Sequence, residues 1–163
     1  MKKWLDIFNI IVMALVFTIG TAFSEPMASP DFQVESADGK IITKKSLEGK
    51  PTLLMLWASW CGVCQRELPN LKKLHDQVQG KEIQILAIGT QDIQANINRY
   101  VKDHADIFTF PVAYDRGNIA SAAYQVRGVP TFVLLDENGE IAFKHVGGGF
   151  MSDPALKRFI EGL

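Results

Sequence analysis

The feature that most constrains the fold is an unbroken apolar run, PTLLMLWAS, at residues 51–59. A strand that faces water on one side alternates apolar and polar residues, whereas a strand buried on both faces is apolar throughout. The run therefore predicts a central strand in a sheet that helices cover on both faces. Such an arrangement belongs to the α/β class.

The segments around this run alternate between strand and helix patterns. Apolar residues at helical spacing predict helices, and short apolar runs bounded by turn residues predict strands. The predicted elements are a hairpin within 31–43 around Asp38-Gly39, the central strand, a helix through Pro69 to about Gly80, a strand at 82–89, a helix to about His104, a strand at 110–114, a helix at 118–124, a hairpin of 131–135 and 141–146, and a helix entered at 152–154. We expect a mixed central sheet flanked by helices.

The amino terminus has the pattern of an export signal. Lys2 and Lys3 precede an uncharged, mostly apolar stretch at residues 7–24. This stretch is also just long enough to span a bilayer. It is therefore either a signal peptide cleaved after Ser24 or a retained membrane anchor. In both cases the lysines stay inside and the rest of the chain is exported.

We expect three parts: residues 1–24 as signal or anchor, residues 25–30 as a linker, and residues 31–163 as a single domain. Its location would be periplasmic or otherwise extracytoplasmic. With 47% hydrophobic and 21% charged residues, the composition is that of a globular domain. A net charge of -1 gives no reason to expect nucleic acid as a partner.

The chain contains only two cysteines, Cys61 and Cys64. A structural disulfide framework needs more cysteines at wider spacing, and so short a loop gains little from a covalent link. A zinc site needs two more ligands, and the three histidines (His75, His104 and His145) are far apart in the sequence. We interpret the cysteines as a redox pair that needs no metal or cofactor.

The redox pair follows the central strand and precedes a helix. Unpaired amide groups and the helix dipole stabilise an anion at a helix amino terminus, so Cys61 should exist partly as thiolate. This thiolate would attack a substrate disulfide, and Cys64 would then attack Cys61 and release the reduced substrate.

The motifs around the pair resemble those of the thioredoxin superfamily, and they are most similar to the exported TlpA/ResA-type oxidoreductases, which include cytochrome c maturation reductases. The motifs are WASWCGVC at 57–64, QRELP at 65–69, YQVRGVPT at 124–131 and DENG at 136–139. The resemblance extends from about residue 31 to the carboxyl terminus. It implies a thioredoxin fold with an N-terminal β-hairpin and a central αβ insertion at about 91–114.

The resemblance also implies roles for individual residues. Cys61 would be the nucleophile and Cys64 the resolving cysteine. Pro130 matches the family's cis-proline, which faces the cysteine pair, and the backbone of Val129 would pair with the substrate chain. Independently of the resemblance, Trp60 flanks the pair in the sequence, and packing logic predicts that it shields the thiolate and contacts substrate.

Glu67 lies three residues after Cys64, so on a helix the two face nearly the same side. Its carboxylate could take the proton of Cys64 and activate it for the resolving attack. The alternative is a solvated helix glutamate. Met55 stands where thioredoxins keep a buried acid, which leaves Glu67 as the candidate proton acceptor.

We therefore expect an extracytoplasmic reductase of protein disulfides that receives electrons from a membrane thiol donor, with apocytochrome c as one candidate client. A disulfide oxidant or isomerase is the first alternative, although Gly62-Val63 lacks the histidine of strongly oxidising relatives. A copper chaperone is a second alternative, although Pro130 beside the pair should hinder metal coordination by the cysteines. A thiol peroxidase is a third, but residues 58–60 lack the Thr and Pro that normally precede its cysteine.

Overall fold

The computed structural model describes residues 29–163, and the predictions for residues 1–28 lie outside the described part. The elements are β1 (Gln33–Ser36), β2 (Ile41–Thr43), α2 (Lys44–Leu47), β3 (Thr52–Trp57), α3 (Gly62–Gln77), β4 (Gln84–Gly89), α4 (Gln94–Asp103), β5 (Val112–Tyr114), η2 (Arg116–Asn118), α5 (Ile119–Ala123), β6 (Thr131–Leu135), β7 (Ile141–Val146), η3 (Phe150–Ser152) and α6 (Pro154–Glu161).

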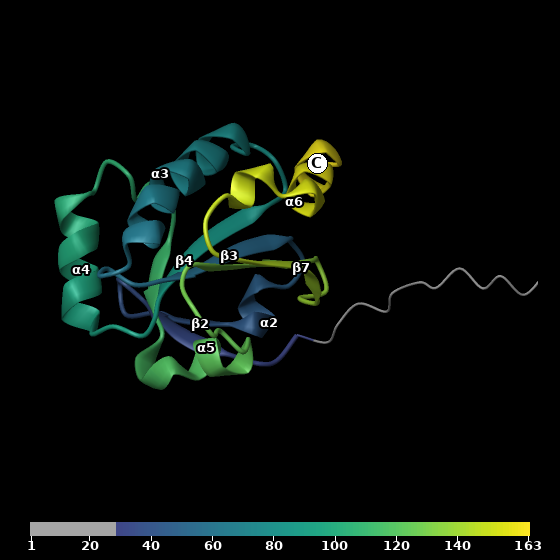
Figure 1. The fold of residues 1–163 in the computed structure, drawn as a ribbon. Coiled ribbons are helices and arrows are strands. Elements are labelled where there is room, and N and C mark those ends of the chain that lie inside the picture. Colours follow the sequence, from purple (N-terminus) through teal and green to yellow (C-terminus); the bar gives the residue numbers. More distant parts are fainter. Residues whose placement is uncertain (1–28) are drawn as a thin grey trace, which may run out of the picture.

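These strands form one seven-stranded sheet in the order β2-β1-β5-β4-β3-β6-β7. β3 pairs in parallel with β4 and antiparallel with β6, so the predicted mixed sheet is confirmed. Figure 1 shows α3 and α6 on one side of the sheet and α2 and α5 on the other. The N-terminal hairpin is β1–β2, and the central insertion supplies α4 and β5.

An apolar cluster fills each face of the sheet. One contains Leu68, Leu71 and Leu74, which α3 presents at helical spacing, and the other contains Leu47 of α2 and Ala120 of α5. All six residues of β3 are buried, as the apolar run predicts. Burying one leucine side chain contributes about 2 kcal/mol, so the two clusters hold β3 and α3 firmly and fix the junction between them.

The helix α2 is not predicted by the sequence patterns. It has four residues, too few to show a periodicity. Thr43 begins it through a capping box, in which the Thr43 hydroxyl accepts the Ser46 N–H and the Ser46 hydroxyl accepts the Thr43 N–H. Because a capping box usually ends in Glu or Gln, a serine in that position conceals the signal.

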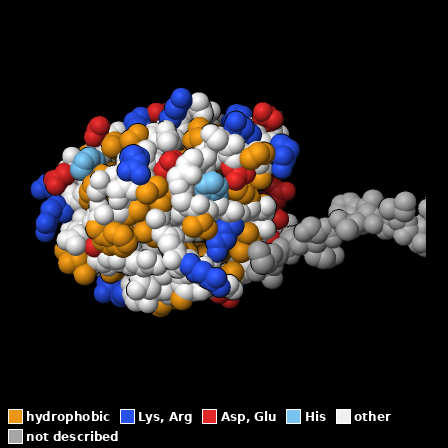
Figure 2. Space-filling view, viewed as in Figure 1, with side chains coloured by type: hydrophobic (Ala, Val, Ile, Leu, Met, Phe, Trp, Pro, Cys, Tyr) orange, Lys and Arg blue, Asp and Glu red, His pale blue; other side chains and the backbone are white. Residues whose placement is uncertain are grey.

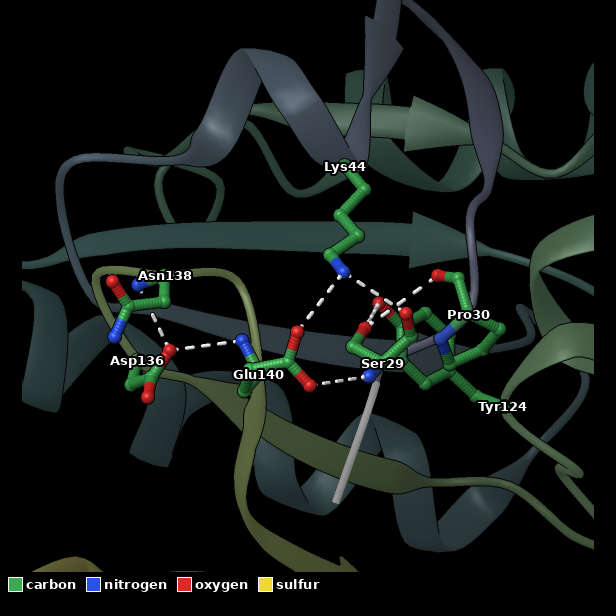
Figure 3. A network of polar contacts seen from close by, with 7 residues as sticks. All are labelled: Ser29, Pro30, Lys44, Tyr124, Asp136, Asn138 and Glu140. Carbon is green, nitrogen blue, oxygen red and sulfur yellow. Dashed lines mark hydrogen bonds and ion pairs between the residues drawn. The ribbon is translucent and has the colours of Figure 1, made fainter. Parts of the chain in front are cut away.

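The chain enters the domain at the end of the sheet where β3 begins. There, the Ser29 N–H donates to Glu140 Oε2 at 2.9 Å, and Lys44 Nζ donates to the Ser29 carbonyl at 2.9 Å (Figure 3). Lys44 also forms an ion pair with Glu140 at 3.4 Å, and the Ser29 and Tyr124 hydroxyls lie 2.9 Å apart. Burial raises the pKa of Tyr124 to about 12. We call these four residues the entry network.

The surface carries charges of both signs. Figure 2 shows Lys and Arg side chains interspersed with Asp and Glu side chains over the face in view. Among residues 29–163, no helix has both the length and the apolar character needed to cross a bilayer.

Candidate active site

Cys61 and Cys64 form a disulfide where β3 passes into α3. Cys61 is the N-cap of α3, and its Sγ accepts the N–H of Cys64 at 3.1 Å. The two Cα atoms lie 5.2 Å apart. Cys64 is completely buried, whereas Cys61 keeps 6% of its surface exposed. Of the two cysteines, Cys61 is therefore the more accessible to a partner.

The proline loop lies directly beside this pair. The Val129–Pro130 peptide bond is cis, and the Val129 carbonyl oxygen lies 3.4 Å from Cys61 Sγ. Pro130 is buried and Val129 is half-buried. The antiparallel pairing of β6 with β3 places the start of β6 at the end of β3. The structure thus brings together Cys61, Cys64, Val129 and Pro130.

Trp60, in the segment between β3 and α3, extends into solvent and is 62% exposed. Its indole Nε1–H donates to the carbonyl of Gln91 at 3.0 Å. Gln91 has a left-handed φ of 53°, and its N–H donates to Asn118 Oδ1 at 2.9 Å. The segment after β4 therefore supports Trp60 beside Cys61.

Asp92 belongs to this site, and the sequence reasoning missed it. Its Oδ2 accepts the N–H of Ser59 at 2.9 Å and the Ser59 hydroxyl at 2.6 Å, while its Oδ1 accepts from Ile93 and Asn96. Partial burial raises the pKa of Asp92, but the hydrogen bonds from Ser59 and Asn96 outweigh it and hold that pKa below its ordinary value. The available signal was that β3 and β4 are parallel, so residues just after both strands meet at one edge.

Glu67 is buried on α3, with 7% of its surface exposed. Its Oε1 accepts the N–H of Gly149 at 2.8 Å, and its Oε2 accepts from Asn70 at 3.1 Å. Within residues 29–163, this carboxylate accepts hydrogen bonds from these two residues and from neither cysteine. It is not a solvated helix glutamate. The Gly-Gly-Gly sequence after β7 was the signal for the loop that receives it.

Other parts of the described structure do not extend this site. Among residues 29–163, no group of three or more His, Cys, Asp and Glu side chains is placed to hold a metal ion. Met55 is completely buried in the apolar cluster that also contains both cysteines. A groove of about 760 Å³ lies along the β1–β2 hairpin and α5, and none of the predicted site residues line it.

Comparison with known proteins gives a consistent set of matches. Residues 27–144 match the AhpC/TSA family, a span that includes both cysteines and Pro130. The thiol-disulfide oxidoreductase ResA of Halalkalibacterium halodurans is 29% identical over 164 residues, covering 96% of this chain and 91% of its own. ResA of Bacillus cereus is 30% identical over 159 residues, covering 90% of this chain and 91% of its own.

Among solved structures, one described as a thiol:disulfide interchange protein DsbE from Chlorobium tepidum superimposes with a TM-score of 0.74 at 26% sequence identity. The match covers 86% of this chain and 98% of that one. The likeness therefore extends over the sheet and the junction that carries the cysteines.

Proposed function

The chain belongs to the AhpC/TSA family and is a thiol–disulfide oxidoreductase, and from this premise we propose that it reduces protein disulfides outside the cytoplasm through Cys61 and Cys64. The observation that carries the proposal is the position of Cys61 as N-cap of a 16-residue helix, with the Cys64 N–H on its sulfur. That N–H and the helix dipole stabilise a thiolate on Cys61 in the dithiol form.

The reaction proceeds in two exchanges. The Cys61 thiolate attacks a substrate disulfide, so that a mixed disulfide forms and one substrate sulfur leaves and takes up a proton. Cys64 then loses its proton and attacks Cys61, which breaks the mixed disulfide and releases the second substrate sulfur as a thiol. The substrate gains two electrons and two protons, and the protein is left with the Cys61–Cys64 disulfide.

The neighbouring residues take the roles that their positions allow. Glu67 accepts the proton of Cys64 before the resolving attack, which is supported by its burial one turn further along the same helix. Val129 offers backbone to the substrate chain beside Cys61, and Pro130 fixes that backbone. Trp60 contacts the substrate through its exposed indole.

Net reduction requires a supply of electrons. We assign this to a membrane thiol donor that reduces the Cys61–Cys64 disulfide after each cycle, and we place apocytochrome c among the clients. The apolar stretch at 7–24 supports export, as a cleaved signal or as an anchor. The Gly62-Val63 dipeptide supports the reducing direction because it lacks the histidine that strongly oxidising relatives place between their cysteines. The redox potential depends on how strongly the reduced thiolate is stabilised.

The deciding measurement is the reduction potential of the pair, obtained by equilibrating the protein with redox buffers. We expect a value near or below about -250 mV, as in thioredoxin. A value near about -120 mV, as in strong disulfide oxidants, contradicts the reductase and makes the protein a disulfide donor.

Variants test the division of labour between the cysteines. Cys64→Ser should accumulate a mixed disulfide with a reducible protein such as insulin, whereas Cys61→Ser should form none and lose reductase activity. Trapping through Cys64 in the Cys61→Ser protein contradicts the assignment. Copper titration of the dithiol form and peroxide consumption examine the two rival chemistries, and tight copper binding or rapid peroxide turnover would replace the proposed function.

The location is tested with the full chain in cells. After mild reduction, a membrane-impermeant maleimide should label Cys61 in intact cells whose outer envelope is permeable. A cytoplasmic thiol protein serves as the control that must stay unlabelled. Labelling of Cys61 only after lysis contradicts export.

A further inference from the structure

Both ring nitrogens of His145 in β7 are engaged. Nδ1 lies 3.0 Å from Asp153 Oδ2, and Nε2 lies 3.1 Å from the carbonyl oxygen of Gly148. A carboxylate and a carbonyl can only accept hydrogen bonds. Both bonds are therefore made at once only when both nitrogens carry hydrogen, which is the cationic imidazolium.

The carbonyl that His145 contacts belongs to the same peptide unit as the N–H that holds Glu67. The carbonyl is that of Gly148, and the N–H is that of Gly149, which donates to Glu67 Oε1 at 2.8 Å. One peptide group thus connects the histidine to the buried carboxylate. A donor on its carbonyl polarises the peptide and strengthens its N–H as a donor.

We propose that His145, oriented by Asp153, is a positioning residue that holds the Glu67 carboxylate through the Gly148–Gly149 peptide. The inference rests on the proposed function, in which Glu67 takes the proton of Cys64. It adds residues from β7 and from the start of α6 to the resolving step.

The loop that carries this peptide is shaped for the contact. A Cβ on Gly148 would lie 3.0 Å from Glu67 Oε1 and 3.3 Å from a methyl group of Val63, so a larger residue would push the peptide off the carboxylate. Gly149 has a φ of 85°, in the left-handed region that favours glycine.

The histidine is also held from the other side. Asp153 is the N-cap of α6, with Oδ1 accepting the N–H of Ala155 at 2.9 Å while Oδ2 faces His145. The bond from Ala155 and the bond from His145 hold the pKa of Asp153 below its ordinary value. The side chains of His145 and Asp153 are 20% and 22% exposed, so the pair is only partly screened by solvent.

The kinetic test separates the two exchanges. The reduced protein is mixed, at one fixed pH, with an aromatic disulfide that releases a coloured thiolate, where the first release reports attack by Cys61 and the second reports attack by Cys64. His145→Val suits a strand and should slow the second phase by about threefold, the effect of weakening one hydrogen bond, while the first phase is unchanged. Asp153→Asn keeps the helix cap and should slow the second phase by a smaller factor.

The same substitution in a Glu67→Gln background decides whether His145 acts through Glu67. We expect His145→Val to have no further effect there. Equal slowing in both backgrounds overturns the proposal, and so does an unchanged second phase in His145→Val when Glu67→Gln slows it. His75→Ala, which removes a half-buried histidine from the last turn of α3, is the control and should change neither phase.

A spectroscopic measurement keeps the inference distinct from the proposed function. If Glu67→Gln leaves the second phase unchanged, the proposed role of Glu67 fails, and the Gly149 amide proton still reports the coupling. We expect its NMR resonance to move upfield in folded His145→Val, because its hydrogen bond weakens, and not to move in His75→Ala. An unmoved resonance in His145→Val overturns the inference.

Discussion

The two ends of the sheet hold their carboxylates in different ways. Beside the redox pair, Glu67 and Asp92 accept hydrogen bonds from backbone N–H groups and neutral side chains, and neither is in an ion pair within the described part of the chain. At the opposite end, Glu140 forms an ion pair with Lys44. The Ser29 N–H donates to Glu140, and Lys44 donates to the Ser29 carbonyl.

This difference follows from what each end must do. A lysine or arginine bonded directly to the Glu67 or Asp92 carboxylate would favour the charged form of that carboxylate. Neutral donors hold Glu67 and Asp92, and the His145–Asp153 ion pair at this end involves neither of these carboxylates. Away from the cysteines, an ion pair holds the chain where it enters the domain.

The largest effect should come from Asp92→Ala. It removes the acceptor of four hydrogen bonds, and we expect a loss of about 3 kcal/mol in the free energy of unfolding. Reductase activity should fall as well, because Ser59 directly precedes Trp60 and Cys61. Urea unfolding and insulin reduction measure the two effects, and an unchanged rate would show that Asp92 does not order the cysteine loop. The exposed Asp103→Ala on α4 is the control.

The contribution of Asp92 should depend on pH. Since its pKa lies below the ordinary 3.8 in the folded state, its stabilisation is fully present above pH 3.8 and is lost as the pH falls through the folded value. The difference in stability between the wild type and Asp92→Ala should therefore narrow in acid.

Lys44→Met tests the opposite end. It removes the ion pair with Glu140 and the hydrogen bond to the Ser29 carbonyl. We expect a loss of about 2 kcal/mol in the free energy of unfolding. The rate of disulfide reduction should stay the same, because the entry network lies at the other end of the sheet. The neighbouring, exposed Lys45→Met provides the comparison. A large loss of activity in folded Lys44→Met would break the distinction between the two ends.

Gly148→Ala, at the cysteine end, should lower the free energy of unfolding and slow the resolving step, and the two effects are measured separately. The added Cβ would crowd Glu67 Oε1 at 3.0 Å, and overpacking of this kind costs about 1.5 kcal/mol. We expect a slower resolving step with normal attack by Cys61, measured with the coloured disulfide. In Gly128→Ala a Cβ meets no atom within 4 Å, so its unfolding curve is the reference for stability.

Tyr124→Phe should have the smallest effect at neutral pH, about 1 kcal/mol from the lost bond to Ser29. Burial raises the pKa of Tyr124 to about 12, above its ordinary value of 10.0. Its contribution is therefore present below pH 10 and is lost as the pH rises through about 12. Unfolding in alkali should show this loss in the wild type and not in Tyr124→Phe.

Local patterns made much of the fold predictable. The apolar run of β3, the helical spacing in α3 and the Asn138-Gly139 turn each lie within a few residues. The redox pair was also visible, because its chemistry depends on two cysteines three residues apart. Asp92 and His145 come to the cysteine end from the loop after β4 and from β7. The parallel course of β3 and β4 was a signal for Asp92, but no sequence pattern records the proximity of His145.

The two rims of the sheet have a consequence for assembly. β2 spans only Ile41–Thr43 and passes directly into α2, while on the rim strand β7 the Lys144 side chain reaches back to the Tyr124 carbonyl at 2.6 Å. Short edge strands, and lysine side chains on edge strands, discourage the addition of further strands from other chains. An oxidoreductase of protein disulfides meets chains that are not fully folded, and such chains readily extend an open sheet. At its β2 edge this protein offers them only three residues of backbone, which should limit the addition of client strands there.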